Sequence, residues 1–164
     1  MTTDFPAHAE YLAFAETLAD QSRRMLLAVK GSAPKDDIKS DASFVTTADK
    51  AVEPALRAMI QETYPDHGIL GEEFNNINID ADFVGVLDPI DGTAAFVAGI
   101  PVYGTLIGLA WQGQPYVGVI DHPITSDRWT GVSGRMVEHN GTQVRVRACA
   151  SVETAYATCS NADL

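Results

Sequence analysis

The 164-residue sequence lacks the features of a secreted, membrane-spanning or disulfide-stabilised protein. Its two cysteines, Cys149 and Cys159, are too few for a disulfide framework and do not have the spacing of a redox or zinc motif. No apolar run approaches the ~20 residues that a membrane span requires. The N-terminus, MTTDFPAHAE, has neither the basic region nor the apolar run of a signal peptide. These absences predict a cytoplasmic protein with free thiols.

Basic residues are also scarce, because 11 Lys and Arg stand against 22 Asp and Glu, which gives a net charge of -11. No run of Lys or Arg forms a basic patch, and Arg145 and Arg147 alternate like the exposed face of a strand. We therefore expect the chain to bind neither nucleic acid nor a membrane. An acidic protein that acts on an anionic substrate needs cations between the two, which is a first indication of a metal.

The length and the hydrophobic content of 46% suit one globular domain over residues 1–164. A first helix is predicted over residues 7–30, ended by Gly31, and a second from about residue 47 to Tyr64. Thr46 and Asp49 have the spacing of a capping box at the start of the second helix. Pro54 would fit that helix only in its first turn or at a bend. The apolar positions of the first helix, with Ser22 as the polar exception, are Tyr11, Phe14, Leu18, Met25 and Val29.

Residues 32–45 are polar and predict a loop or a loose hairpin. From residue 68 the pattern changes to short strands joined by Gly, Pro and Asn turns. One of these turns is Asn140-Gly141, a dipeptide typical of tight hairpins. The order of elements predicts an α+β fold, with two long helices packed on one face of a mostly antiparallel sheet. The predicted strands are GILGEE, which runs into an acidic loop, DFVGVLD, VYGTLIGLAWQG, PYVGVIDH, RWTGVSG, RMVEH and TQVRVRA.

The stretch LDPIDGTAAF, residues 87–96, places Asp88 and Asp91 three residues apart at the end of an apolar strand. Together with Glu72, these acids could hold Mg²⁺, which prefers oxygen ligands. Asp88 would bridge two ions, and a turn directly after it, fixed by Pro89, would present the carbonyl of Ile90 and aim Asp91 at the second ion. Residues 93–97 could form a helix whose N-terminal N–H groups hold phosphate.

A second interpretation of the same residues needs no metal. Asp-Pro and Asp-Gly are common turn formers, so the sequence DPID could be explained by turn chemistry alone. The Gly-Glu-Glu segment at residues 71–73 could likewise be a solvated loop. From the residues themselves, both interpretations stay open.

The six residues 88–93, DPIDGT, match the DP[IL]DG[ST] pattern of the inositol monophosphatase family, which this chain resembles. Other marks of that family occur in order: Val45-Thr46-x-x-Asp49 lies upstream, and Gly71-Glu72-Glu73 lies between. Residues 41–46, 104–107, 118–123, 128–131 and 147–150 are most similar to the bacterial histidinol-phosphate phosphatases of the family. The resemblance runs from the first helix to the last residue.

The resemblance implies a role for each matching residue. Glu72, Asp88 and the Ile90 carbonyl would hold one Mg²⁺, and Asp88 would bridge to a second ion that Asp91 also binds. Thr93 would pair with Asp49 and, with Glu72, would orient the water that attacks phosphorus. Asp91, Gly92 and Thr93 would bind the substrate, through the N–H groups of Gly92 and Thr93 in particular.

The chain also departs from the family pattern. Phe44 replaces a usual proline, and Ala94 replaces a side chain that could contact substrate. Members of the family continue into a C-terminal α/β domain with a Trp-Asp motif that completes the second metal site. No Trp-Asp pair occurs here, so we expect the N-terminal domain alone, as a fragment or a natural truncation.

The function implied by the resemblance is a Mg²⁺-dependent phosphomonoester hydrolase that forms a homodimer. Histidinol phosphate, an intermediate of histidine biosynthesis, is the expected substrate. An inositol-1-monophosphatase or a broad sugar-phosphate phosphatase is the alternative within this class. A truncated, catalytically inactive domain that binds metal or a partner is the alternative of another class.

Overall fold

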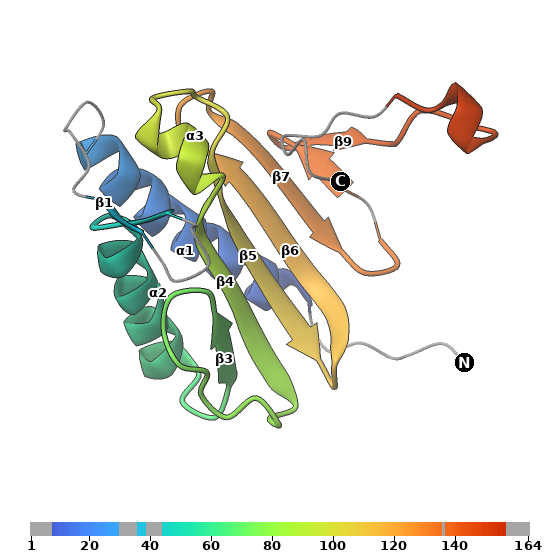
Figure 1. Ribbon diagram of the computed structural model, residues 1–164. Coiled ribbons are helices and arrows are strands. Elements are labelled where there is room, and N and C mark those ends of the chain that lie inside the picture. Colours follow the sequence, from blue (N-terminus) through green and yellow to red (C-terminus); the bar gives the residue numbers. More distant parts are fainter. Residues whose placement is uncertain (1–7, 30–35, 39–43, 136, 157–164) are drawn as a thin grey trace.

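The computed structural model describes residues 8–29, 36–38, 44–135 and 137–156. Its centre is a seven-stranded sheet in the order β3-β4-β5-β6-β7-β8-β9 (Figure 1). Within the described residues, β3 and β4 run parallel and every other neighbouring pair in this sheet is antiparallel. The strands are β3 (Gly68–Gly71), β4 (Phe83–Asp91), β5 (Gly104–Trp111), β6 (Gln114–His122), β7 (Asp127–Val132), β8 (Val137–His139) and β9 (Thr142–Val144).

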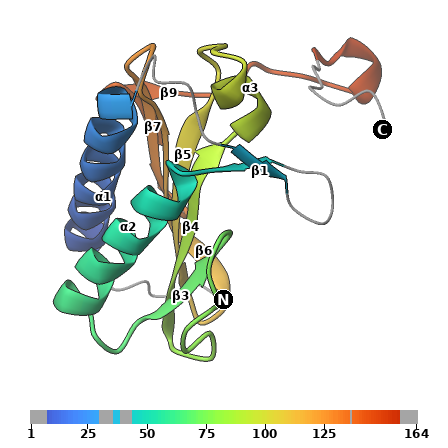
Figure 2. The ribbon, with the colours of Figure 1, turned by 60° about the vertical axis from the view of Figure 1, so that its left-hand side comes forward.

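Two long helices, α1 (His8–Val29) and α2 (Asp49–Thr63), lie side by side on one face of this sheet (Figure 2). They bury their apolar stripes against the inward-facing residues of the strands, which confirms the predicted α+β arrangement. A 3-10 turn, η1 (Val152–Thr154), follows the sheet. None of the described helices is both long and apolar enough to cross a membrane. The core includes Leu18, Leu26, Val52, Leu56, Ile60, Ile69, Leu87, Ile107, Tyr116 and Val119.

The polar exception in the stripe of α1, Ser22, is fully buried. Its hydroxyl forms a 2.6 Å hydrogen bond with the hydroxyl of Thr105 on β5, so burial leaves neither group without a partner. Val29, which the pattern placed in the stripe, is 37% exposed. The last turn of α1 therefore does not follow the predicted buried stripe. Gly31, the predicted stop, lies outside the described residues.

The predicted capping residues of α2, Thr46 and Asp49, bond each other reciprocally, although the N-cap residue itself is Ala48 and makes no side-chain cap bond. The Asp49 carboxylate accepts hydrogen bonds from the Thr46 N–H at 2.8 Å and from the Thr46 hydroxyl at 2.7 Å. The Thr46 Oγ1 in turn accepts from the Asp49 N–H at 3.3 Å. Pro54 is the sixth residue of the helix, so it lies beyond the first turn. The loop expected before this helix contains a short antiparallel hairpin of β1 (Asp36–Ile38) and β2 (Phe44–Thr46).

Strand β4 is longer than the sequence indicated. It continues through Pro89 to Asp91, with a register shift against β5 between Asp88 and Asp91. The expected turn directly after Asp88 is therefore wrong, because an irregular strand tolerates a proline that cannot donate to the ladder. The chain turns at Gly92, whose φ of 82° is a left-handed conformation that glycine adopts readily. The predicted helix follows as α3 (Thr93–Val97).

The C-terminal hairpin matches one prediction and corrects another. Asn140 and Gly141, with φ of 49° and 74°, form the turn between β8 and β9. Two positive φ values are what a two-residue turn needs to match the twist of its strands. Strand β9 ends at Val144, so Arg145 and Arg147 lie beyond it and not on its exposed face.

The face of the sheet opposite the helices carries exposed apolar side chains. One cross-strand row runs through Leu70, Val86, Gly108, Gly118, Gly131 and Val137. Leu70, Val86 and Val137 are 41%, 37% and 45% exposed. The three neighbouring glycines leave the middle of this row without side chains. No helix among the described residues covers this face (Figure 2).

Candidate functional site

The two acidic segments meet at one edge of the sheet because β3 and β4 are parallel. Gly71 at the end of β3 pairs with Leu87, so the next residues are Glu72, directly after β3, and Asp88, on β4. Parallel neighbours direct their carboxyl ends the same way, which brings segments that are 16 residues apart in sequence into contact. Asp91, three residues further along β4, is exposed at the same end.

Asp88 is half-buried, and its Oδ1 atom is buried with no hydrogen-bond partner. Burial, the adjoining Glu72 carboxyl and the Asp91 charge together raise the pKa of Asp88 to about 8. The largest cause is the loss of solvation on burial, and like-charge crowding adds to it. A cation beside these oxygens would relieve the repulsion and occupy the unpartnered atom.

Asp49 contributes a second buried oxygen of the same kind. It is 1% exposed, and while its Oδ2 is bonded to Thr46, its Oδ1 has no partner. Burial raises the pKa of Asp49, and the charge of Glu72 adds to that effect. The cap of α2 therefore also belongs to the electrostatic surroundings of Glu72.

Thr93, at the start of α3, donates its hydroxyl proton to the carbonyl of Ile90 at 3.1 Å. A hydroxyl has one proton to donate, so in this arrangement it does not donate to Asp49, and the expected pairing stays a prediction. The Ile90 carbonyl thus lies beside the first turn of α3. The N–H groups at the start of a helix have no intrahelical acceptor, which leaves those after Gly92 suited to an anion.

The donor set fits Mg²⁺ by its chemistry. Carboxylates and one backbone carbonyl are hard oxygen ligands, and Mg²⁺ usually keeps several waters in its octahedral shell. Within the described part of the chain, however, no three Asp, Glu, His or Cys side chains converge as a ready-made metal site. The carboxylates would have to move toward an ion, and water would have to supply the remaining ligands.

Sequence reasoning missed the residues that support these segments. The Thr105 hydroxyl, itself bonded to Ser22, donates to the carbonyl of Pro89 at 2.9 Å and so fixes the irregular part of β4. On α2, Glu53 and Arg57 are buried charges next to the segment that carries Glu72. Two features of the sequence could have indicated these residues. Ser22 is a polar residue within the apolar stripe of α1, and Glu53 and Arg57 are an acid and a base one helical turn apart on α2.

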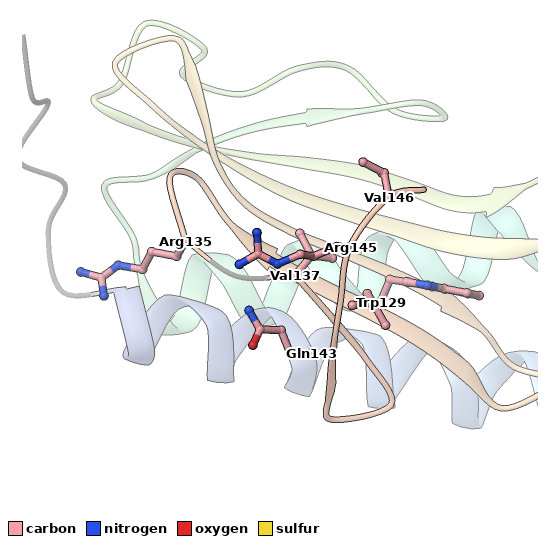
Figure 3. Close-up of a pocket in the computed structure, with 7 residues that line it drawn as sticks. Trp129, Arg135, Val137, Gln143, Arg145 and Val146 are labelled. Atoms are coloured by element: carbon pink, nitrogen blue, oxygen red, sulfur yellow. The ribbon is translucent and has the colours of Figure 1, made fainter. Parts of the chain in front are cut away.

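A cavity of about 690 Å³ lies elsewhere, along β7, β8 and β9 and the segment after them (Figure 3). Strands β5 and β6 separate β7 from β4 in the sheet. The cavity therefore does not contain the predicted acidic residues. Its lining consists of Trp129, Arg135, Val137, Gln143, Val144, Arg145 and Val146.

The sheet with two helices on one face, and the acidic residues before a short helix, define an α+β fold with a candidate metal site. The sequence matches the inositol monophosphatase family over residues 7–162. It is 42% identical over 150 residues to the bifunctional phosphatase IMPL2 of Arabidopsis thaliana chloroplasts, a match that covers 89% of this chain and 43% of the relative. The chain belongs to the inositol monophosphatase family.

Other relatives differ in their names. A histidinol-phosphatase of Mycobacterium tuberculosis is 42% identical over 99 residues, covering 60% of this chain and 38% of the relative. Among solved structures, the extragenic suppressor protein suhB from Bartonella henselae superposes with a TM-score of 0.82 at 28% identity, over 86% of this chain and 56% of that one. An inositol monophosphatase from Zymomonas mobilis gives 0.74 at 37% identity, over 88% and 56%. The chain thus spans about half the length of the relatives it matches.

Proposed function

We propose that this protein acts as a Mg²⁺-dependent phosphomonoester hydrolase. The observation that carries the proposal is the buried, unpartnered oxygen of Asp88, placed between Glu72 and Asp91 and just before α3. A protein seldom leaves a buried carboxylate oxygen without a partner unless a ligand supplies one. The names of the relatives support hydrolysis of a phosphate ester.

Each residue has a stated task in this proposal. Glu72, Asp88 and the Ile90 carbonyl would hold one Mg²⁺, and Asp88 and Asp91 a second. The bound ions would lower the pKa of water and neutralise the phosphate charge. Thr93 and Asp49, with Glu72, would orient the attacking water, while the N–H groups of Gly92 and Thr93 would hold the phosphate oxygens.

Phosphate release from a phosphate monoester, with and without Mg²⁺, tests the activity. We expect Asp88→Asn to abolish release, because amide oxygens cannot supply the charge that two cations require. The matched control is Asp82→Asn, which makes the same change at an exposed position just before β4. Equal release by the Asp88→Asn variant and the unaltered chain would refute the proposed role of Asp88.

For the substrate, we propose histidinol phosphate, supported by the relatives that are named histidinol-phosphatase. Solved relatives named inositol monophosphatase support inositol 1-phosphate, or a broad range of sugar phosphates, as the alternative. The kcat/KM values for histidinol phosphate and inositol 1-phosphate separate the two. A clear preference for the inositol ester would exclude the histidinol assignment.

A non-catalytic role is the alternative of another class. It is supported by the lack of three convergent Asp, Glu, His or Cys ligands among the described residues. In that case the chain would bind Mg²⁺ without releasing phosphate from either ester. Mg²⁺-dependent turnover that is lost in Asp88→Asn would exclude this alternative.

We further propose that the protein forms a homodimer. The exposed apolar row on the open face of the sheet supports association, because large exposed apolar patches are uncommon on monomers. Sedimentation equilibrium measures the assembled mass. A single species at the 17.6 kDa mass of one chain across a wide concentration range would contradict this proposal.

A further inference from the structure

We propose that the buried ion pair of Glu53 and Arg57 on α2 is a positioning device for Glu72. The pair would fix the loop that carries Glu72 and thereby set the affinity of the acidic site for Mg²⁺. This inference rests on the proposed function in one respect, namely that Glu72 is a Mg²⁺ ligand.

Glu53 and Arg57 face the loop after β3 and are 0% and 7% exposed. Arg57 Nε donates to Glu53 Oε1 at 2.7 Å. Glu53 Oε2 accepts from the N–H of Glu73 at 2.8 Å. The two terminal nitrogens of Arg57 donate to the carbonyls of Phe74 and Asn75, each at 3.0 Å. Three consecutive residues after Glu72 are thus bonded through their backbone to the pair.

The residue before Glu72 is also fitted to the pair. A Cβ atom on Gly71 would overlap the Glu53 carboxylate and the Arg57 guanidinium. Glycine at this position lets the end of β3 lie directly on the two charged groups. Glu72 is therefore held from both sides, by close packing before it and by hydrogen bonds after it.

Stability alone does not explain such a pair. The desolvation of two buried charges offsets much of their attraction, and apolar residues of similar volume often stabilise a fold equally well. Apolar side chains could not, however, bond three backbone groups of one loop. Glu72, Phe74 and Asn75 are exposed, so packing in the core contributes little to fixing them. The planar guanidinium, with its fixed fork of donors, suits this task.

The test is Arg57→Lys, measured by calorimetric titration with Mg²⁺ in the full chain. Lysine keeps the charge but cannot reproduce the fork that reaches Glu53, Phe74 and Asn75 together. Mutating a group that orients a metal ligand typically weakens the metal affinity 10- to 100-fold, so we expect the Kd of Arg57→Lys for Mg²⁺ to rise by about 10-fold. Circular dichroism establishes that the variant is folded.

The matched control is Arg23→Lys. Arg23 on α1 also makes two bonds to a buried carboxylate, that of Asp121 on β6, at 2.9 and 2.6 Å. We expect this variant to lose stability but to keep its Kd for Mg²⁺ within about twofold, because Arg23 bonds Asp121 on β6 and not the loop that carries Glu72. A merely structural role for Arg57 would make the two variants alike. Equal Mg²⁺ affinity in both variants would overturn the inference, as would an unaltered chain that binds no Mg²⁺.

A measurement on the unaltered chain decides the matter if Arg57→Lys does not fold. The Glu73 amide, which donates to a buried carboxylate, should exchange its hydrogen slowly although its neighbours are exposed. Exchange at the rate of a free loop would overturn the inference. A chain that binds Mg²⁺ through this arrangement but releases no phosphate would refute the proposed activity and still support the positioning role.

Discussion

Replacing Asp88 by asparagine should stabilise the metal-free fold while removing metal binding. The folded chain ionises Asp88 at a pKa of about 8, against the ordinary value of 3.8 that it has when unfolded. Above pH 3.8 the unfolded state therefore loses the proton first, and the folded state becomes relatively less stable until the pH passes 8. The variant has no such proton, so its advantage should grow as the pH rises through this interval.

The magnitude follows from the same shift. Each pKa unit corresponds to about 1.4 kcal/mol, but Asp88 is only half-buried and solvent screens its interactions. After that discount we expect Asp88→Asn to raise the free energy of unfolding by about 1–2 kcal/mol at pH 7. The Asp88 carboxylate accepts a hydrogen bond from the Ile90 N–H, and the side-chain oxygen of asparagine can accept the same bond.

Urea denaturation in a chelator at several pH values, followed by the same series with Mg²⁺, measures both effects. Mg²⁺ should stabilise the unaltered chain and leave the variant unchanged. Asp82→Asn, at an exposed acid, should alter the free energy of unfolding by less than about 0.5 kcal/mol in either series. The reasoning is refuted if Asp88→Asn is the less stable protein in the chelator, or if Mg²⁺ stabilises both proteins equally.

Three further predictions concern the metal, a histidine and two glycines. Calorimetry should show one tighter Mg²⁺ event that Glu72→Gln removes, because the second site has only Asp88 and Asp91; two equally tight events would show a wrong ligand assignment. His67 stacks between Tyr64 and Phe83, with ring centroids at 4.5 and 5.0 Å, and burial lowers its pKa. As the pH falls below about 6.5, the imidazole of His67 is therefore protonated in the unfolded state before it is protonated in the folded state. The free energy of unfolding of His67→Phe, relative to that of the unaltered chain, should increase from pH 7 to pH 5. A difference in urea denaturation that does not depend on pH would contradict this. A Cβ atom at Gly118 would meet nothing within 4 Å, so Gly118→Ala should raise the free energy of unfolding by about 0.5 kcal/mol. Gly92 has a φ of 82°, so Gly92→Ala should lower the free energy of unfolding by about 1 kcal/mol. Equal thermal midpoints for the two variants would count against this argument.

Local patterns in the sequence predicted most of the fold. The reciprocal bonds of Thr46 and Asp49 and the turn at Asn140-Gly141 depend on residues within a few positions of each other, so their chemistry is visible in the sequence. The prediction was less accurate where tertiary pairing acts. Strand β4 continues past Pro89 because β5 provides an irregular partner, and no neighbouring residue indicates that.

The candidate site shows the same division. The spacing of DPIDGT and the nearby Gly-Glu-Glu segment identified the acidic residues, because those residue types and their order determine which ligands are available. Only the parallel pairing of β3 with β4 brings Glu72 beside Asp88, and only the tertiary structure supplies the burial and the nearby carboxyls that raise the pKa of Asp88 to about 8. The contacts of Glu53 and Arg57 with the loop after β3 were likewise decided by tertiary structure. Sequence order determines which groups a chain carries, whereas distances and solvation are set by which distant segments pack together.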